Sequence, residues 1–308
     1  MPDFVSHFVR TQDGLNLHVR DYGRRSDVRL PVVCLHGLAR TGADFHHLAI
    51  ALSDDSAGPR QVIAMDYRGR GRSDYDPNAA NYNAGVEFND VLTVLAASGI
   101  GRAIFIGTSR GGILTMLLAA ARLDLLAGAV LNDIGPVIEP GGLMRIKGYV
   151  GKLSQPTSFE EGGEMLRRLF GVQFTALTPQ DWLAFAQRSF EQRNGRLVAC
   201  YDPAIAQTLA DIDPSEPLPA LWAQFDALAG VPLLVLRGEN SDLLSRETVA
   251  AMLQRRPDLQ VLEVPAQGHP PLLMEDDVIA RIGRFIAECD AASGCWRSSR
   301  CDTARRPQ

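Results

Sequence analysis

The sequence predicts an α/β protein with a doubly wound, mostly parallel eight-stranded sheet and an inserted helical cap. Three observations support this prediction. Short, continuously apolar runs recur along the chain, as expected for parallel strands that helices cover on both faces. Segments with helical periodicity alternate with these runs, and such alternation requires right-handed crossover connections. Between residues 135 and 228 the alternation stops, and helical segments follow one another without a convincing strand.

The strands begin with two segments of alternating apolar and polar residues around Asp13-Gly14. This dipeptide favours tight hairpins, so the first two strands should be antiparallel. The later strands are continuously apolar, which is typical of the buried centre of a sheet. The expected strands are 4–10, 15–22, 31–35, 62–65, 103–106, 127–131, 232–236 and 260–264.

Helices are expected where apolar residues recur with a period near 3.6. They are 43–52, 86–97, 113–121, 143–153, 159–170, 180–193, 246–255 and 277–289. We divide the chain into a core of residues 1–134 and 229–289 and a cap of residues 135–228 inserted in the core. Residues 290–308 form a polar tail with little apolar surface to bury, and we expect this tail to be disordered.

Composition narrows the range of partners. The 308 residues are 46% hydrophobic and 22% charged, which is typical of a globular protein. The formal net charge of -5 argues against nucleic acid as a partner, because phosphate binding needs a basic surface. No apolar run approaches the roughly 20 residues that span a bilayer, and the N-terminus lacks the residue order of a secretion signal. We therefore expect a cytoplasmic protein with no membrane partner.

The cysteines and glycines do not indicate a cofactor. Five cysteines are an odd number, and Cys34 lies within an apolar strand, so a disulfide framework is not expected. Cys295 and Cys301 lack a histidine at zinc-binding spacing, so no metal site is expected. The glycine-rich loop after Asp66 lacks the third glycine and the following helix that a phosphate loop needs.

Ser109 lies at a sharp turn between the apolar strand 103–106 and a buried helix. Gly107 and Gly111 flank it in the Gly-x-Ser-x-Gly spacing of a nucleophile elbow, in which strand and helix approach closely. The N-terminus of the helix then points at any oxyanion that forms at Ser109. The short motif also occurs by chance, with Ser109 as an ordinary turn serine, but the flanking strand and helix make it specific.

A serine nucleophile needs a base, and the base needs a third group that fixes its tautomer. His269, between Gly268 and Pro270 after the last strand, is the expected base. Asp242 follows the strand 232–236 and is the expected acid, although it could instead cap the next helix. Asp133 also follows a strand and is the alternative acid. We favour Asp242, because the turn after Asp133 can occupy that carboxylate with backbone N–H groups.

The remaining site residues are expected near these three. The backbone N–H groups of Leu38 and Arg110 are expected to form the oxyanion hole, because fixed donors aim at charge only where it develops. Arg40 is either a solvated loop charge or a partner for a substrate carboxylate. Trp182 and Phe190 share one stripe of a cap helix, and they either seal the cap against the core or roof an apolar cleft.

With these motifs the chain resembles the α/β-hydrolase fold family over residues 4–289. The resemblance rests on His36-Gly37, Asp66-Tyr67-Arg68-Gly69-Arg70-Gly71-Arg72-Ser73, Gly107-Thr108-Ser109-Arg110-Gly111-Gly112, Gly238-Glu239-Asn240-Ser241-Asp242 and Gly268-His269. It implies a cofactor-free serine hydrolase whose cap lies between the sixth and seventh strands of the sheet. It also implies a small-molecule substrate that is an ester, a lactone or a related carbonyl compound, cleaved through an acyl-Ser109 intermediate.

Two other functions remain open for a chain that resembles this family. Carbon-carbon bond hydrolases of the meta-cleavage type usually carry Gly-Pro-Gly after His-Gly, whereas this chain has Leu38-Ala39-Arg40. A small-molecule receptor on the same fold would show at most slow, single-event hydrolysis. Arg110 also departs from the family pattern, since many relatives carry Met or Gln there, but its backbone N–H donor is unaffected.

Overall fold

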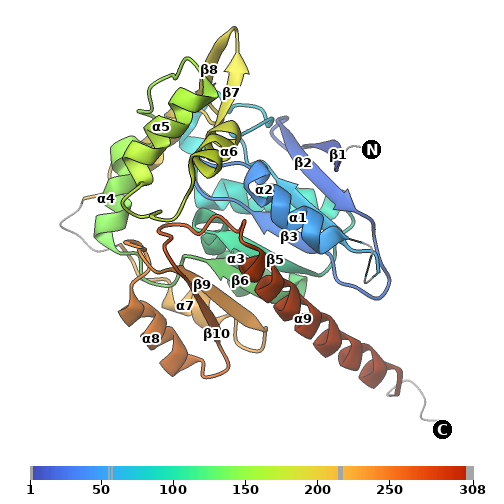
Figure 1. Ribbon diagram of the computed structural model, residues 1–308. Helices are drawn as coiled ribbons and strands as arrows, with labels where there is room; N and C mark the ends of the chain where they lie inside the picture. The colour runs from blue at the N-terminus through green and yellow to red at the C-terminus, as the bar shows by residue number, and fades with distance from the viewer. Residues whose placement is uncertain (1–2, 55, 57, 214–217, 303–308) are drawn as a thin grey trace.

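An eight-stranded sheet forms the centre of the protein, with the strand order β1-β2-β4-β3-β5-β6-β9-β10 (Figure 1). The computed structural model describes residues 3–54, 56, 58–213 and 218–302. The strands of the sheet are β1 (Val5–Arg10), β2 (Asn16–Gly23), β3 (Val32–Leu35), β4 (Gln61–Met65), β5 (Ala103–Thr108), β6 (Leu126–Asn132), β9 (Leu233–Gly238) and β10 (Gln260–Val264). The predicted fold class is confirmed.

The strand directions bring several loops to one edge of the sheet. β2 runs antiparallel to both of its neighbours, β1 and β4, as expected for the opening hairpin. The pairs β3·β4, β3·β5, β5·β6, β6·β9 and β9·β10 are parallel. The carboxyl ends of β5, β6 and β9 therefore lie side by side, where ligands bind in open α/β sheets.

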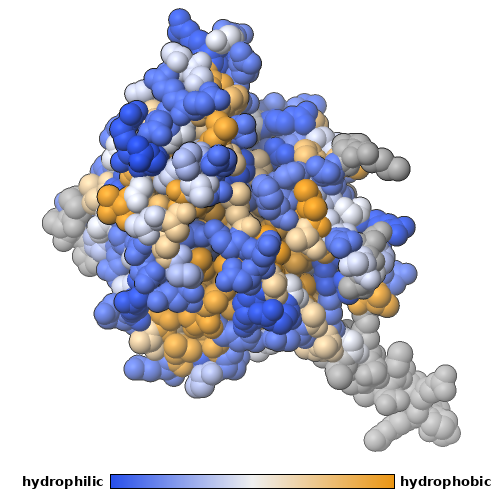
Figure 2. All heavy atoms as spheres, in the orientation of Figure 1, coloured by the Kyte–Doolittle hydropathy of each residue, from blue (hydrophilic) through white to orange (hydrophobic). Residues whose placement is uncertain are grey.

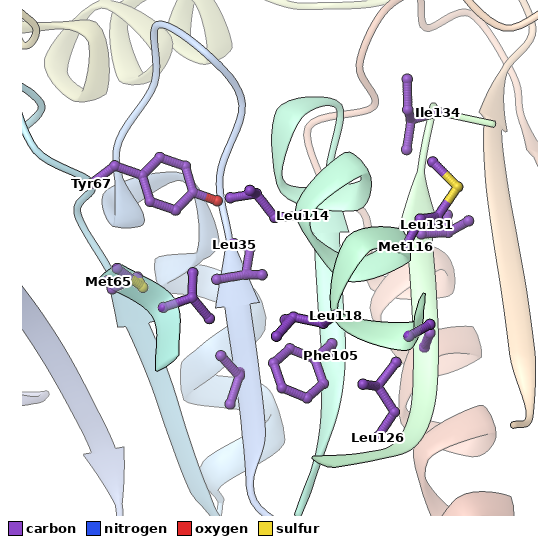
Figure 3. Close-up of a cluster of buried hydrophobic side chains, with 14 of the residues drawn as sticks. Leu35, Met65, Tyr67, Phe105, Leu114, Met116, Leu118, Leu126, Leu131 and Ile134 are labelled. Carbon is purple, nitrogen blue, oxygen red and sulfur yellow. The ribbon is translucent and has the colours of Figure 1, made fainter. Parts of the chain in front are cut away.

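Helices cover both faces of the sheet. One face packs against α1 (His46–Ser53) and α9 (Asp276–Asp302), and the other against α2 (Ala84–Ala97), α3 (Arg110–Arg122), α7 (Trp222–Asp226) and α8 (Arg246–Arg255). Figure 3 shows the second interface, where Leu114 and Leu118 of α3 face Phe105 and neighbouring strand side chains. Apolar burial on both faces explains the continuously apolar strands, because neither face of these strands meets water. Short 3-10 helices lie at η1 (Gly42–Phe45), η3 (Ala79–Asn81), η4 (Leu123–Leu125) and η5 (Pro203–Leu209).

The segment between β6 and β9 forms a cap that lies over the carboxyl edge of the sheet (Figure 1). Its elements are α4 (Pro140–Tyr149), α5 (Phe159–Phe170), α6 (Pro179–Ser189) and the hairpin of β7 (Phe190–Arg193) and β8 (Arg196–Ala199). The cap has an apolar core of its own, which includes Leu166, Trp182 and Phe190. The face in Figure 2 is mostly hydrophilic, with hydrophobic residues in scattered patches. The division of the chain at residues 134 and 229 stays a prediction.

The hairpin in the cap was not predicted. The helix expected over 180–193 ends at Ser189, and the chain continues as an extended strand from Phe190. Asn194 and Gly195 connect β7 to β8 with φ angles of 51° and 76°. Asn-Gly is the dipeptide that adopts such left-handed turns most readily, so the signal for this hairpin was present in the sequence.

Residues 290–302 continue α9, and the disorder expected for residues 290–308 stays a prediction. The remainder of the predicted tail, residues 303–308, lies outside the described residues. Asp290 accepts a hydrogen bond from the backbone N–H of Leu30 at 3.0 Å and forms an ion pair with Arg60 at 2.5 Å. The Arg60 side chain is only 4% exposed, and a buried guanidinium needs a carboxylate partner. These two contacts attach the beginning of this segment to the core. Within the ranges that the structure describes, no helix is both long and apolar enough to cross a membrane.

Candidate active site

Ser109 lies at the turn between β5 and α3 and has φ 50° and ψ -110°. A positive φ is strained for a residue with a side chain, and it projects the hydroxyl away from the sheet edge. The turn is tight, because a Cβ atom on Gly107 would lie 2.5 Å from the backbone of Gly111. A Cβ atom on Gly111 would lie 1.9 Å from the carbonyl oxygen of Leu35. The predicted role of both glycines in the close approach of strand and helix is confirmed.

His269 lies on the loop after β10, and its Nε2 is 2.9 Å from the Oγ of Ser109. The residue is 5% exposed. The side-chain amide of Asn132 donates hydrogen bonds to the Oγ1 of Thr108 and to the carbonyl oxygen of Pro271, both at 3.0 Å. These bonds connect the end of β6 to the elbow and to the histidine loop. The structure therefore brings the predicted nucleophile and base together.

Asp133, and not Asp242, contacts the histidine. The Oδ2 of Asp133 lies 2.8 Å from the Nδ1 of His269, and the carboxylate is fully buried. It also accepts hydrogen bonds from the backbone N–H of Gly238 at 2.8 Å and from the hydroxyl of Ser241 at 2.5 Å. The prediction that Asp242 orients His269 is wrong, and the alternative acid occupies that position.

Asp242 instead connects the loop after β9 to the cap. Its carboxylate accepts two hydrogen bonds from Arg145 of α4, at 2.7 and 2.8 Å. Burial acts to raise the pKa of Asp242, but the Arg145 guanidinium outweighs it and holds the pKa below its ordinary value. β6 and β9 are neighbours in the sheet, so both carboxylates follow adjacent strand ends. Which of them reaches the histidine depends on the path of each loop, which strand prediction does not provide.

The loop after β3 lies beside the nucleophile. Leu38 lines the same cavity as Ser109, and a Cβ atom on Gly37 would lie 3.9 Å from the Cβ of Ser109. Arg110 is the first residue of α3, so its backbone N–H belongs to the N-terminal turn of that helix. The Arg110 side chain pairs with the buried Glu87 at 2.6 Å. The backbone donors proposed for the oxyanion hole are thus placed on the two segments that flank Ser109.

His36 holds this loop in place. Its Nδ1 donates to the carbonyl oxygen of Gly37 at 2.7 Å, and its Nε2 accepts from the backbone N–H of Tyr67 at 3.2 Å. Complete burial lowers the pKa of His36 to about 4, so the ring is neutral at pH 7 and can keep both roles. The expectation that His36 organises the loop through hydrogen bonds is confirmed.

A cavity lies between the carboxyl ends of the strands and the cap, with about 990 Å³ of empty space that includes its open mouth. Most of its lining is apolar, as is typical of small-molecule sites. Its lining residues from the cap are Ile146, Tyr149, Val150, Leu153, Leu166, Phe170, Phe174, Phe185, Arg188, Ser189 and Tyr201. Trp182 and Phe190 are not among them, although they are buried in the same apolar cluster of the cap as Phe170 and Phe185. Their prediction as pocket residues is wrong, and Phe185, one turn along the same helix from Trp182, lines the cavity instead.

Arg40 lines the cavity but is neither a solvated charge nor a free one. Its guanidinium pairs with both oxygens of Asp44, at 2.7 and 2.5 Å. It also donates to the Oγ of Ser189 at 2.7 Å and lies over the ring of Phe185 at 4.6 Å. Both of these partners belong to α6, so Arg40 fastens the cap to the core.

No group of three or more His, Cys, Asp or Glu side chains is arranged to hold a metal ion within the described part of the chain. The polar groups next to Ser109 are those of an acid-base relay. A carboxylate that accepts from Nδ1 leaves the lone pair of Nε2 directed at the serine hydroxyl. Such an arrangement can transfer the serine proton to the histidine and stabilise the imidazolium that results.

Comparison with known proteins shows which family the chain is similar to. A model of the Alpha/beta hydrolase family matches residues 32–282. A 3-hydroxybutyrate-oligomer hydrolase from Cupriavidus necator is 34% identical over 288 residues, which are 91% of this chain and 96% of the relative. The Escherichia coli esterase YbfF is 36% identical over 266 residues, 83% of this chain and 92% of the relative. Among solved structures, an alpha/beta hydrolase from Novosphingobium aromaticivorans has 40% identity and a TM-score of 0.87, over 93% of this chain and 99% of that one.

The family match covers most of the chain, and both relatives exceed 30% identity over most of their own length. We conclude that this protein belongs to the alpha/beta hydrolase family.

Proposed function

We propose that the protein is a serine hydrolase that cleaves a small carboxylic ester or lactone through an acyl-Ser109 intermediate. The observation that carries this proposal is the continuous chain of contacts from Asp133 through His269 to Ser109. In this assignment Ser109 is the nucleophile, His269 is the general base and acid, and Asp133 is the residue that orients His269.

Acylation begins when the Oγ of Ser109 attacks the carbonyl carbon of the ester and its proton passes to the Nε2 of His269. The carbonyl oxygen becomes an oxyanion, which the backbone N–H groups of Leu38 and Arg110 stabilise. The tetrahedral intermediate then collapses, the bond to the leaving oxygen breaks, and His269 returns its proton to that oxygen. In a lactone the released alcohol remains attached to the acyl group.

Deacylation repeats these steps with water in place of the serine hydroxyl. His269 takes a proton from water as the water oxygen attacks the acyl carbon. The tetrahedral intermediate collapses, the bond between the acyl carbon and the Oγ of Ser109 breaks, the acid is released, and His269 returns the proton to that Oγ. The negative charge of Asp133 stabilises the imidazolium in both half-reactions. The proposed reaction uses only these side chains, backbone donors and water.

The names of the relatives support an ester as substrate. One is an esterase, and the other is a hydrolase of 3-hydroxybutyrate oligomers. A hydroxy acid that is joined through its hydroxyl and carboxyl groups forms an ester bond. The apolar lining contributed by Phe170, Phe174 and Phe185 suits a short aliphatic acyl or alcohol group.

Labelling with a fluorophosphonate tests the nucleophile. Only a hydroxyl activated by a neighbouring base attacks phosphorus readily, so we expect labelling at Ser109 and none in the Ser109→Ala variant. Ser189→Ala is the matched control, because Ser189 lines the same cavity but bonds to Arg40 and to the carbonyl of Phe185. Undiminished labelling of Ser109→Ala, with its fold intact by circular dichroism, contradicts the proposal.

A substrate panel tests the bond that is cleaved. We expect multiple turnovers with p-nitrophenyl esters or lactones and none with vinylogous diketones. Turnover of the diketones alone would instead favour a carbon-carbon bond hydrolase. A single slow event per molecule with every ester would favour a small-molecule receptor.

A further inference from the structure

Two arginines line the active-site cavity, Arg40 and Arg188, and they differ in their partners. Arg188 lies on α6 and lines the cavity together with Ser109 and His269. Its side chain is 12% exposed, so the guanidinium lies largely away from bulk water. The cap therefore places a positive charge in the space that a substrate at Ser109 would enter.

The partners of Arg188 leave its hydrogen-bonding capacity largely unused. Its Nη2 lies 3.0 Å from the thioether sulfur of Met274, which is a weak acceptor. Its Nε lies 3.9 Å from the Oδ1 of Asp44, beyond hydrogen-bond distance. Among the residues that the structure describes, Arg188 makes no hydrogen bond to an oxygen atom. Asp44 cannot serve it well, because Arg40 already holds both of its carboxylate oxygens.

The charges in the cavity do not balance. Its charged lining residues are Arg40, Asp44 and Arg188. One positive charge remains after Arg40 and Asp44 pair. Burial lowers the pKa of Arg188 below its ordinary value, and the nearby Asp44 only partly opposes that effect. The cationic form is thus held in a site that disfavours it, and an anion bound beside it would relieve this cost.

We infer that Arg188 binds a carboxylate on the substrate, so that the enzyme prefers esters that carry a free carboxylate at one end. A guanidinium presents two parallel N–H donors that match a carboxylate. The apolar side chains of Phe170 and Phe185 would contact the aliphatic part between the carboxylate and the ester. The inference rests on the proposed ester hydrolysis at Ser109 and adds the chemical class of the substrate.

Two matched substrate pairs test the inference, and they place the charge on opposite sides of the ester. Mono-p-nitrophenyl glutarate and p-nitrophenyl valerate differ by a carboxylate on the acyl side. The linear dimer of 3-hydroxybutyrate and its methyl ester differ by a carboxylate on the alcohol side. The variants are Arg188→Met, which removes the charge and keeps an unbranched side chain, and Arg188→Lys, which keeps the charge. Arg168→Met is the control, since Arg168 is an exposed cap arginine on α5.

We expect the wild type to prefer the anionic member in at least one pair, and that pair shows on which side Arg188 acts. Arg188→Met should lower kcat/KM for the anionic ester roughly 10- to 100-fold, the range of a charge-assisted hydrogen bond. Most of this loss should appear in KM, because the carboxylate is present in both the ground state and the transition state of the anionic ester. For the neutral ester, kcat/KM should change less than about twofold, because it has no carboxylate for Arg188 to bind. Arg188→Lys should retain part of the preference, and Arg168→Met all of it.

Other outcomes overturn the inference. An equal loss on charged and neutral esters in Arg188→Met would mean that Arg188 only supports the cap. A wild type that turns over neutral esters through Ser109 without preferring either anionic one would refute the inference and leave the proposed function standing. Hydrolysis that survives Ser109→Ala would instead refute the proposed function, whatever the charge of the ester.

Discussion

Replacing Asp133 by Asn should abolish turnover without unfolding the protein. The Oδ1 of Asp133 accepts the backbone N–H of Gly238, and its Oδ2 accepts from His269 and from the hydroxyl of Ser241. An Asn side chain would keep its oxygen toward Gly238, because the reverse orientation sets two N–H donors against each other in a buried site. Leaving such a donor unsatisfied costs about 1–3 kcal/mol.

The favoured orientation turns the amide N–H₂ toward the Nδ1 of His269. The histidine must then accept a hydrogen bond at Nδ1 and carry its proton at Nε2, which is the wrong tautomer for taking the proton of Ser109. We expect kcat to fall roughly 10,000-fold, by analogy with the same substitution in a serine protease triad. The free energy of unfolding should fall by about 1–3 kcal/mol, because the hydroxyl of Ser241 already accepts from the backbone N–H groups of Leu243 and Leu244 and loses the acceptor of its own proton.

Asp242→Asn is the matched control for this experiment. The change removes the ion pair with Arg145, whose partner carboxylate is 35% exposed. Pairs of this kind contribute about 0–1 kcal/mol after solvent screening, so turnover should stay within a few-fold of the wild type. Hydrolysis of p-nitrophenyl butyrate and urea unfolding would be measured for both variants. An active Asp133→Asn protein beside a well-folded, inactive Asp242→Asn protein would refute the reasoning.

Three further predictions concern residues around the site and at the end of the chain. Burial lowers the pKa of His36 from its ordinary value of 6.5 to about 4. Between these two pH values His36 is protonated in the unfolded chain but not in the folded protein, so the free energy of unfolding decreases as the pH falls from 6.5 toward 4. From pH 7 to pH 5 the free energy of unfolding should therefore decrease by about 2 kcal/mol less in His36→Asn than in the wild type. Urea unfolding at the two pH values measures this decrease, and an equal decrease in both proteins would contradict the prediction. Asp290→Ala leaves the buried Arg60 without its carboxylate and should lower the unfolding free energy by about 3 kcal/mol; an unchanged melting temperature would show that this contact contributes nothing. Phe170→Ala enlarges the cavity and should shift the preference toward longer esters, whereas Trp182→Ala should cost about 3–5 kcal/mol of stability without changing that preference. The same shift in both variants would mean that the cap acts as one unit.

Local patterns determined the sheet and two of the three residues at its edge. Continuously apolar runs identify buried strands because each such residue meets a helix on one face or the other. The spacing of Gly107, Ser109 and Gly111 identifies the elbow, because a Cβ atom on either glycine would lie within 2.5 Å of neighbouring backbone atoms. The position of His269 follows from the last strand. These features depend on neighbours within a few residues, so the sequence is sufficient to predict them.

The choice of Asp133 over Asp242 depended on the tertiary structure. The two carboxylates follow adjacent strands, and the one that reaches His269 lies 136 residues from it in the chain. Arg145, which occupies Asp242, comes from the cap and lies 97 residues away. No local pattern shows which of the two acids contacts His269 and which contacts Arg145. The outcome depends on the path of both loops and on the position of the cap.

The lining of the cavity and the end of the chain were decided in the same way. Trp182 and Phe185 are one turn apart on one helix and both belong to the core of the cap, yet only Phe185 also lines the cavity, which depends on how the cap packs against the sheet. Arg188 keeps only a 3.9 Å contact with Asp44, because Arg40, 148 positions earlier in the sequence, forms hydrogen bonds to both carboxylate oxygens of Asp44. Asp290 is the first residue of the polar tail that we expected to be disordered, yet it pairs with a buried arginine 230 residues away. The sequence determines which side chains are present, and the packing of distant segments determines which of them are in contact. The physical reason is that a buried charge needs a partner, and that partner can come from any part of the chain that folds against it.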